Sequence, residues 1–118
     1  ISAKVAKIAN CKAIITGENL GQVASQTVES MTVTNFSQTV YPIFRPLIAF
    51  DKKDIIEISR KIGTYETSIL PYEDCCTVFL PKNPVIKPKM EKVIYEESKL
   101  DIDNLVNEAV KNLEIIDC

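Results

Sequence analysis

Two adjacent cysteines, Cys75 and Cys76, follow a proline, a tyrosine and two acidic residues in the segment 71–76. The chain contains no histidine, which excludes Ser-His-Asp triads, Cys-His dyads and histidine-containing zinc sites together. The polar surroundings are typical of a loop, on which at least one thiol reaches a cleft or solvent. Thiol chemistry is therefore one interpretation, and packing of both cysteines as small hydrophobic side chains is the other.

The four cysteines, at positions 11, 75, 76 and 118, lack the spacing of a zinc site. Structural zinc prefers pairs of cysteines separated by about two to four residues. A disulfide between neighbours such as Cys75 and Cys76 would close a strained ring. We therefore expect reduced thiols and no protein-bound metal.

A second candidate site lies in the segment 17–27, which holds two of the three glycines of the chain. It follows the apolar run 12–16, a pattern that predicts a buried parallel strand. In open α/β sheets, ligands bind at the carboxyl ends of the strands. Gly17 would let a ligand approach the backbone, and free amides at the start of a following helix would favour a phosphate. A tight turn before an ordinary capped helix is the alternative.

Helical and strand patterns alternate along the whole chain. We expect one helix over 1–10 and another over 51–63, which ends at a glycine cap. A helix is also expected after Asn19, which can act as the N-cap with Gln22 three residues later, and a last helix is expected after Asp101 or Asp103. Strands are expected over 12–16 and 68–70. The apolar run 43–50 contains Pro46 and predicts a short or edge strand that feeds a loop. The prolines at 71, 81, 84 and 88 predict an extended or loop-like middle segment. This order predicts a single α/β layered unit with a mainly parallel sheet.

Composition adds few constraints on function. The formal net charge of −2 gives no overall attraction to nucleic acid or membrane, and the chain has neither a membrane-spanning apolar run nor a signal peptide. We therefore expect a cytoplasmic protein. One basic stretch could contact RNA phosphates, although a solvated loop is the simpler interpretation; it contains Lys82, Lys87, Lys89 and Lys92.

Three blocks in one order resemble the bacterial tRNA sulfurtransferases, also called tRNA 4-thiouridine synthases or thiamine-biosynthesis sulfur-transfer enzymes. They are GENLGQVASQT at 17–27, RPLIAFDKKDIIEISRKIGTYE at 45–66 and ILPYEDCCTVFLPKNP at 69–84. The resemblance implies a PP-loop ATP pyrophosphatase domain with a nucleotide-hydrolase-like, Rossmann-like α/β fold. It also implies ATP, magnesium, a tRNA substrate, and a cysteine desulfurase that supplies persulfide sulfur, with a role in thiamine synthesis left open.

The resemblance also assigns residues. A glycine and a glutamine of the first block contact ATP in this family, and they fall on Gly17 and Gln26; Glu18, Asn19 and Gln22 are further candidates. The active cysteine of the family commonly precedes a glycine. That match falls best on Cys75 and leaves Cys76 in the usual glycine position, so either thiol remains a candidate.

The phosphate-binding Ser-Gly-Gly-x-Asp-Ser loop of the family does not occur in this sequence. We therefore expect residues 1–118 to be the C-terminal portion of a PP-loop domain, lacking its N-terminal strands and inactive when isolated. Self-association through an exposed sheet edge is also expected. The competing hypothesis is a non-enzymatic structural or interaction fragment, in which the cysteines pack or sense oxidation.

Overall fold

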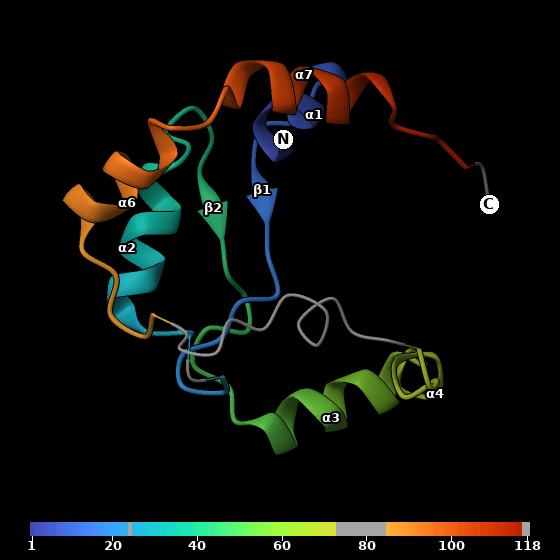
Figure 1. The fold of residues 1–118 in the computed structure, drawn as a ribbon. Coiled ribbons are helices and arrows are strands. Elements are labelled where there is room, and N and C mark those ends of the chain that lie inside the picture. Colours follow the sequence, from blue (N-terminus) through green and yellow to red (C-terminus); the bar gives the residue numbers. More distant parts are fainter. Residues whose placement is uncertain (24, 73–84, 117–118) are drawn as a thin grey trace.

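A small parallel sheet lies at the centre of the molecule (Figure 1). The computed structural model describes residues 1–23, 25–72 and 85–116. In it, β1 (Ile14–Ile15) pairs with β2 (Ile43–Phe44), with Ile14 opposite Ile43 and Ile15 opposite Phe44. The predicted α/β class and parallel pairing are confirmed.

β1 is shorter than the run 12–16 that the sequence predicts, whereas β2 is the short strand expected within 43–50. β2 ends at Phe44 because the chain turns immediately afterwards, with the Ile48 amide donating to the Arg45 carbonyl at 3.2 Å and the Phe50 amide to the Leu47 carbonyl at 3.1 Å. The prediction of a short strand that feeds a loop is therefore confirmed for this segment.

Helices surround the sheet at its ends and along one side. α2 and α6 lie beside the strands, α1 and α7 lie at one end, and α3 with α4 lies at the end where the strands finish (Figure 1). In chain order the described helices are α1 (Ser2–Ile8), α2 (Val28–Phe36), α3 (Lys52–Lys61), α4 (Tyr65–Ser68), α6 (Met90–Glu97) and α7 (Ile102–Lys111). No helix in the described ranges has the length and apolar character needed to cross a membrane.

The helices with strong local signals form where the sequence predicts them. α7 begins after Asp101, whose carboxylate accepts a hydrogen bond from the Asn104 amide at 3.1 Å. α3 begins after Asp51, although that side chain makes no capping hydrogen bond. Gly63 follows α3 with φ of +77°, the left-handed conformation that glycine adopts without steric cost.

The predicted helix beginning after Asn19 is wrong. Residues 17–27 contain no described helix, and α2 begins at Val28. Thr27 is its N-cap, with Oγ1 accepting a hydrogen bond from the Ser30 amide at 3.2 Å. Asn19 does not cap a helix, because its side-chain amide donates hydrogen bonds to the Leu47 and Phe50 carbonyls in the turn after β2.

Two further differences lie in the second half of the chain. The predicted strand over 68–70 is wrong, because the Ser68 amide donates to the Thr64 carbonyl at 3.0 Å and closes the short helix α4. α6 was not predicted, since the density of prolines before residue 90 favoured a loop. It begins two residues after Pro88, and its Met90 and Val93 side chains are half-buried.

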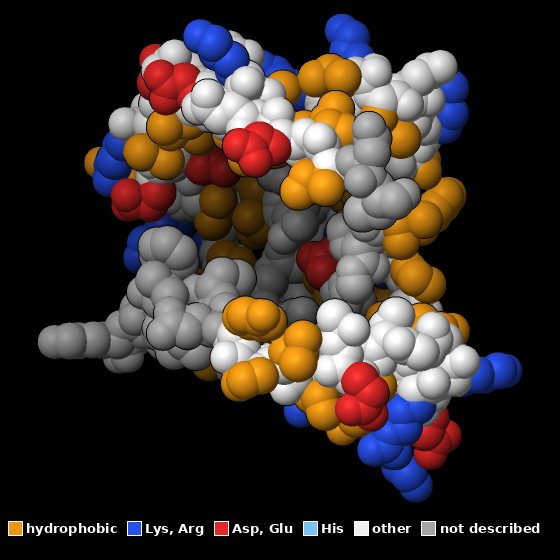
Figure 2. Space-filling view, turned by 90° about the vertical axis from the view of Figure 1, so that its right-hand side faces the viewer, with side chains coloured by type: hydrophobic (Ala, Val, Ile, Leu, Met, Phe, Trp, Pro, Cys, Tyr) orange, Lys and Arg blue, Asp and Glu red, His pale blue; other side chains and the backbone are white. Residues whose placement is uncertain are grey.

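The unit buries little of its apolar surface. It exposes 10021 Å², against about 6,400 Å² for a compact monomer of this size. On the sheet, Ile14 and Ile43 are half-buried, whereas Ile15 and Phe44 on the opposite face are 71% and 57% exposed. Figure 2 shows one face of the molecule hollowed between its upper and lower parts, with hydrophobic side chains visible in the hollow.

Candidate functional site

The segments that follow β1 and β2 meet at the carboxyl edge of the sheet. Asn19 holds them together, because its Nδ2 donates to the Leu47 carbonyl at 2.5 Å and to the Phe50 carbonyl at 2.6 Å. The Leu20 amide adds a bond to the Ile48 carbonyl at 3.1 Å. Asn19 is only 4% exposed, so these bonds satisfy a buried polar side chain.

Glu18 and Arg45 form an ion pair across the same edge. Arg45 Nε donates to Glu18 Oε2 at 2.7 Å, and the two side chains are 13% and 25% exposed. Thr16 Oγ1 donates to the same carboxylate oxygen at 2.8 Å, while Arg45 Nη2 donates to Asn35 Oδ1 on α2 at 2.8 Å. One guanidinium therefore connects the end of β2 with the loop after β1 and with α2.

Gly17 and Gln26 begin and nearly end the loop after β1. A Cβ placed on Gly17 would meet nothing within 4 Å, so the backbone there faces open space. Gln26 Oε1 is buried and has no hydrogen-bond partner among the described residues. The Gln26 carbonyl accepts from the Gly21 amide at 3.1 Å, which folds the loop back on itself. Gln22 is exposed.

Cys75 and Cys76 lie outside the described residues, as do Lys82 and Cys118. Cys11 is described, exposed and free. Within the described ranges, no three Cys, Asp or Glu side chains are grouped as metal ligands.

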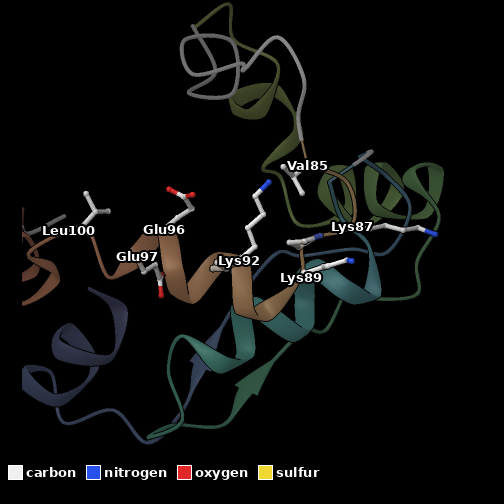
Figure 3. Close-up of a pocket in the computed structure, with 9 residues that line it drawn as sticks. Val85, Lys87, Lys89, Lys92, Glu96, Glu97 and Leu100 are labelled. Carbon is white, nitrogen blue, oxygen red and sulfur yellow. The ribbon is translucent and has the colours of Figure 1, made fainter.

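A groove of about 590 Å³ lies along α6 and the segment before it. Figure 3 shows Lys92 and Glu96 projecting from α6 on the side of Val85, with Lys87 and Lys89 extending from the segment before the helix. Pro88, Val93 and Leu100 add apolar surface to its lining. Three of the four lysines noted in the sequence, Lys87, Lys89 and Lys92, therefore line one groove.

The segment leading to this groove is tied to the carboxyl edge of the sheet. Thr27 Oγ1, one residue after Gln26, donates to the Ile86 carbonyl at 2.8 Å. A separate, smaller polar cavity of about 280 Å³ is lined by Asn35, Gln38, Tyr41, Ile43 and Arg45. The Thr27 bond thus ties the end of the loop after β1 to the segment that lines the groove.

Sequence reasoning did not single out Arg45, although its block was noted. The available signal was a pair of opposite charges, Glu18 and Arg45, placed just after two predicted strands. Parallel strands bring their carboxyl ends to one edge, so such residues become neighbours when the strands are adjacent.

Together these elements define an α/β unit whose candidate site lies at the carboxyl ends of its parallel strands. Proteins with open α/β sheets usually bind their ligands at this end of the sheet. A family model described as "Thiamine biosynthesis protein (ThiI)" matches residues 1–102. The chain belongs to that family.

Curated relatives agree with this assignment. The chain is 60% identical over 115 residues to a probable tRNA sulfurtransferase of Alkaliphilus oremlandii and 58% identical over 116 residues to one of Finegoldia magna. In both comparisons the alignment covers 98% of this chain and 29% of the relative. The chain thus spans less than a third of the length of these relatives.

A solved structure shares the fold. It is described as a crystal structure of a 4-thiouridine synthetase in complex with RNA and with bound ATP. The match has a TM-score of 0.85 and 41% identity, and it covers 94% of this chain and 29% of that one. The resemblance stated from the three sequence blocks is therefore confirmed.

Proposed function

We propose that this chain is the C-terminal portion of the PP-loop ATP pyrophosphatase domain of a tRNA sulfurtransferase, which replaces a uridine oxygen by sulfur to give 4-thiouridine. The family match and the names of the relatives support the reaction class. The excess of exposed surface and the uncovered sheet face, with Ile15 and Phe44, support a unit that packs against further polypeptide.

The observation that carries the nucleotide part of the proposal is the buried Oε1 of Gln26, which has no hydrogen-bond partner in the part of the chain that the structure describes. Leaving a buried acceptor without a donor costs about 1–3 kcal/mol, so a ligand that brings a donor is favoured there. The adenine amino group and the ribose hydroxyls of ATP are such donors. Gly17, whose backbone faces open space, supplies the close approach that a nucleotide requires.

The residues of this chain then have distinct tasks. Gly17 and Gln26 bind and orient the nucleotide, and Gln22, exposed on the same loop, is a further candidate contact. Asn19 and Glu18 hold the loop in place through the bonds described above. When bound, ATP activates the uridine oxygen as a leaving group, and magnesium accompanies its phosphates.

The outer sulfur of a persulfide on Cys75 attacks the activated pyrimidine carbon, and the carbon–sulfur bond forms as the carbon–oxygen bond to adenylate breaks. A further thiol then attacks the Cys75 sulfur, which breaks the sulfur–sulfur bond, leaves Cys75 in a disulfide and releases the 4-thiouridine. Cys76 is the second candidate for this task. A cysteine desulfurase would deliver the sulfur as persulfide, and the same sulfur could serve thiamine synthesis. These steps place the parent enzyme in the cytoplasm, where tRNA and ATP are available.

We propose tRNA as the macromolecular partner. Lys87, Lys89 and Lys92 border the groove along α6 and supply positive charge for phosphate contacts, in addition to RNA contacts made elsewhere in the parent protein. Without the phosphate-binding loop, the isolated chain should bind ATP poorly, turn over nothing, and associate with itself through an exposed sheet edge. Release of pyrophosphate by the purified chain in the presence of tRNA would contradict this.

The decisive test uses the full-length enzyme. Cys75→Ser should abolish 4-thiouridine formation while leaving tRNA-dependent pyrophosphate release intact, and Cys76→Ser, the matched control, should have a milder effect. Gln26→Leu should instead reduce pyrophosphate release. If both cysteine variants and Gln26→Leu leave all activities unchanged, the chain is better described as a structural or interaction fragment whose cysteines pack or sense oxidation.

A further inference from the structure

We infer that Arg45 is a positioning residue for the nucleotide loop, acting through Glu18 rather than by touching the nucleotide. This inference rests on the proposed function, because it assigns a role toward the ATP site formed by Gly17 and Gln26. Neither the family match nor the names of the relatives assign a role to Arg45.

The first observation is where the donors of Arg45 point. Nε donates to Glu18 Oε2 at 2.7 Å and Nη2 to Asn35 Oδ1 at 2.8 Å, so both contacts are made to protein acceptors. With only 13% of its side chain exposed, Arg45 is held between the loop and α2. A guanidinium presents several donors in one rigid plane and can bond both groups at once, which a lysine ammonium on a flexible stem does less well.

The second observation is what Glu18 does. Its Oε2 accepts from Thr16 Oγ1 at 2.8 Å as well as from Arg45. Glu18 lies between Gly17 and Asn19, so fixing this carboxylate fixes the backbone on both sides of it. Asn19 and the Leu20 amide anchor the next two residues to the turn after β2. Glu18 is therefore used by the protein to shape the loop.

These contacts converge on one effect. The loop after β1 is held by Thr16 at the end of β1, by Arg45 with α2 behind it, and by the turn after β2, while the Gly17 backbone faces open space and the buried Gln26 Oε1 has no partner among the described residues. A loop held in place before binding loses less conformational entropy when the ligand arrives. Arg45 should therefore affect how tightly ATP binds more than how fast bound ATP reacts.

The test measures tRNA-dependent pyrophosphate release by the full-length enzyme across ATP concentrations. Arg45→Lys keeps the positive charge but loses the planar guanidinium that bonds two acceptors at once. It should raise the KM for ATP about tenfold and leave kcat within about twofold of the wild-type value. This pattern is expected when the lost charge-assisted hydrogen bond supports the ground state and the transition state equally. Arg60→Lys is the matched control, because Arg60 is exposed and lies 4.6 Å from the Tyr65 ring, away from the loop. It should change neither constant.

A double-variant comparison separates positioning from direct contact. If Arg45 acts through Glu18, the enzyme carrying both Arg45→Lys and Glu18→Gln should have a KM for ATP close to that of the worse single variant. Multiplication of the two single effects would overturn the inference. So would a fall in kcat with KM unchanged, since that pattern reports a smaller population of folded enzyme.

Gln26→Leu, measured by equilibrium ATP binding, separates failure of this inference from failure of the proposed function. Unchanged ATP affinity in Gln26→Leu would overturn the nucleotide site itself. Weaker binding in Gln26→Leu together with an unaltered KM in Arg45→Lys would overturn only the positioning role of Arg45.

Discussion

Replacing Asn19 should loosen the carboxyl edge of the sheet without unfolding the rest of the molecule. Asn19 Nδ2 is the shared donor for the Leu47 and Phe50 carbonyls, and its side chain is almost fully buried. Each of two hydrogen bonds contributes about 1 kcal/mol, and the carbonyls left without a donor add to the cost. Asn19→Ala should therefore lower the local opening free energy by about 2–3 kcal/mol.

Hydrogen exchange reports this local opening directly. The Leu20 amide, which donates to the Ile48 carbonyl at 3.1 Å, lies in the affected contact. A loss of 2–3 kcal/mol corresponds to a fall of about 30- to 140-fold in its protection, at about 1.4 kcal/mol for each factor of ten. The measurement can be made on the full-length enzyme, because exchange is read amide by amide.

Two variants sharpen the result. Asn19→Asp keeps the size and shape of the side chain but replaces the donor by oxygen facing two carbonyl oxygens, so it should lower protection at least as much as alanine does. Asn104→Ala, on an exposed position of α7, should leave the Leu20 amide unchanged. Wild-type protection in Asn19→Asp would refute the reasoning, because it would show that the amide donor is not what holds the edge.

Other variants test single elements through the thermal unfolding midpoint of the full-length enzyme. Thr27→Val removes the N-cap of α2 and the hydrogen bond to the Ile86 carbonyl before α6, and should lower the free energy of unfolding by about 1–2 kcal/mol. An unchanged midpoint would show that Thr27 does not stabilise α2 as a cap. Asp101→Ala should cost about 1 kcal/mol by removing the cap of α7, with asparagine at this position restoring most of the loss. Gly63→Ala should lower the free energy of unfolding by about 1–2 kcal/mol, because φ at this position is +77°. Gly17→Ala should leave the unfolding midpoint unchanged and weaken ATP binding, since a Cβ there meets no atom within 4 Å. Equal destabilisation by the two variants would contradict this difference.

The parts of the fold that local sequence determines were predictable. α7 has its capping aspartate, α3 has its terminal glycine, and each has an apolar stripe at helical spacing, so both form where expected. The parallel sheet followed from the alternation of helices and strands. Local signals failed at Asn19, whose residue type suits a helix cap but whose side chain bonds carbonyls 28 and 31 residues away.

The candidate site was predictable only in part. The loop carrying Gly17 and Gln26 was identified from its glycines and from the resemblance, whereas the pairing of Glu18 with Arg45 joins residues 27 positions apart and depends on adjacency of the two strands. α6 was missed because nearby prolines outweighed a short apolar pattern containing Met90 and Val93. The roles of Cys75 and Cys76 remain predictions from the sequence.

The contacts at the carboxyl end of the sheet all join residues that are a similar number of positions apart in the sequence. Strand pairing, the Asn19 bonds, the Leu20 bond and the Glu18–Arg45 ion pair all join residues between 27 and 31 positions apart. Bringing the chain together over that distance has a length-dependent entropic cost of about 3 kcal/mol. Once the first contact forms, the others incur little further closure cost, so strands and ligand loop should appear in a single kinetic step of folding.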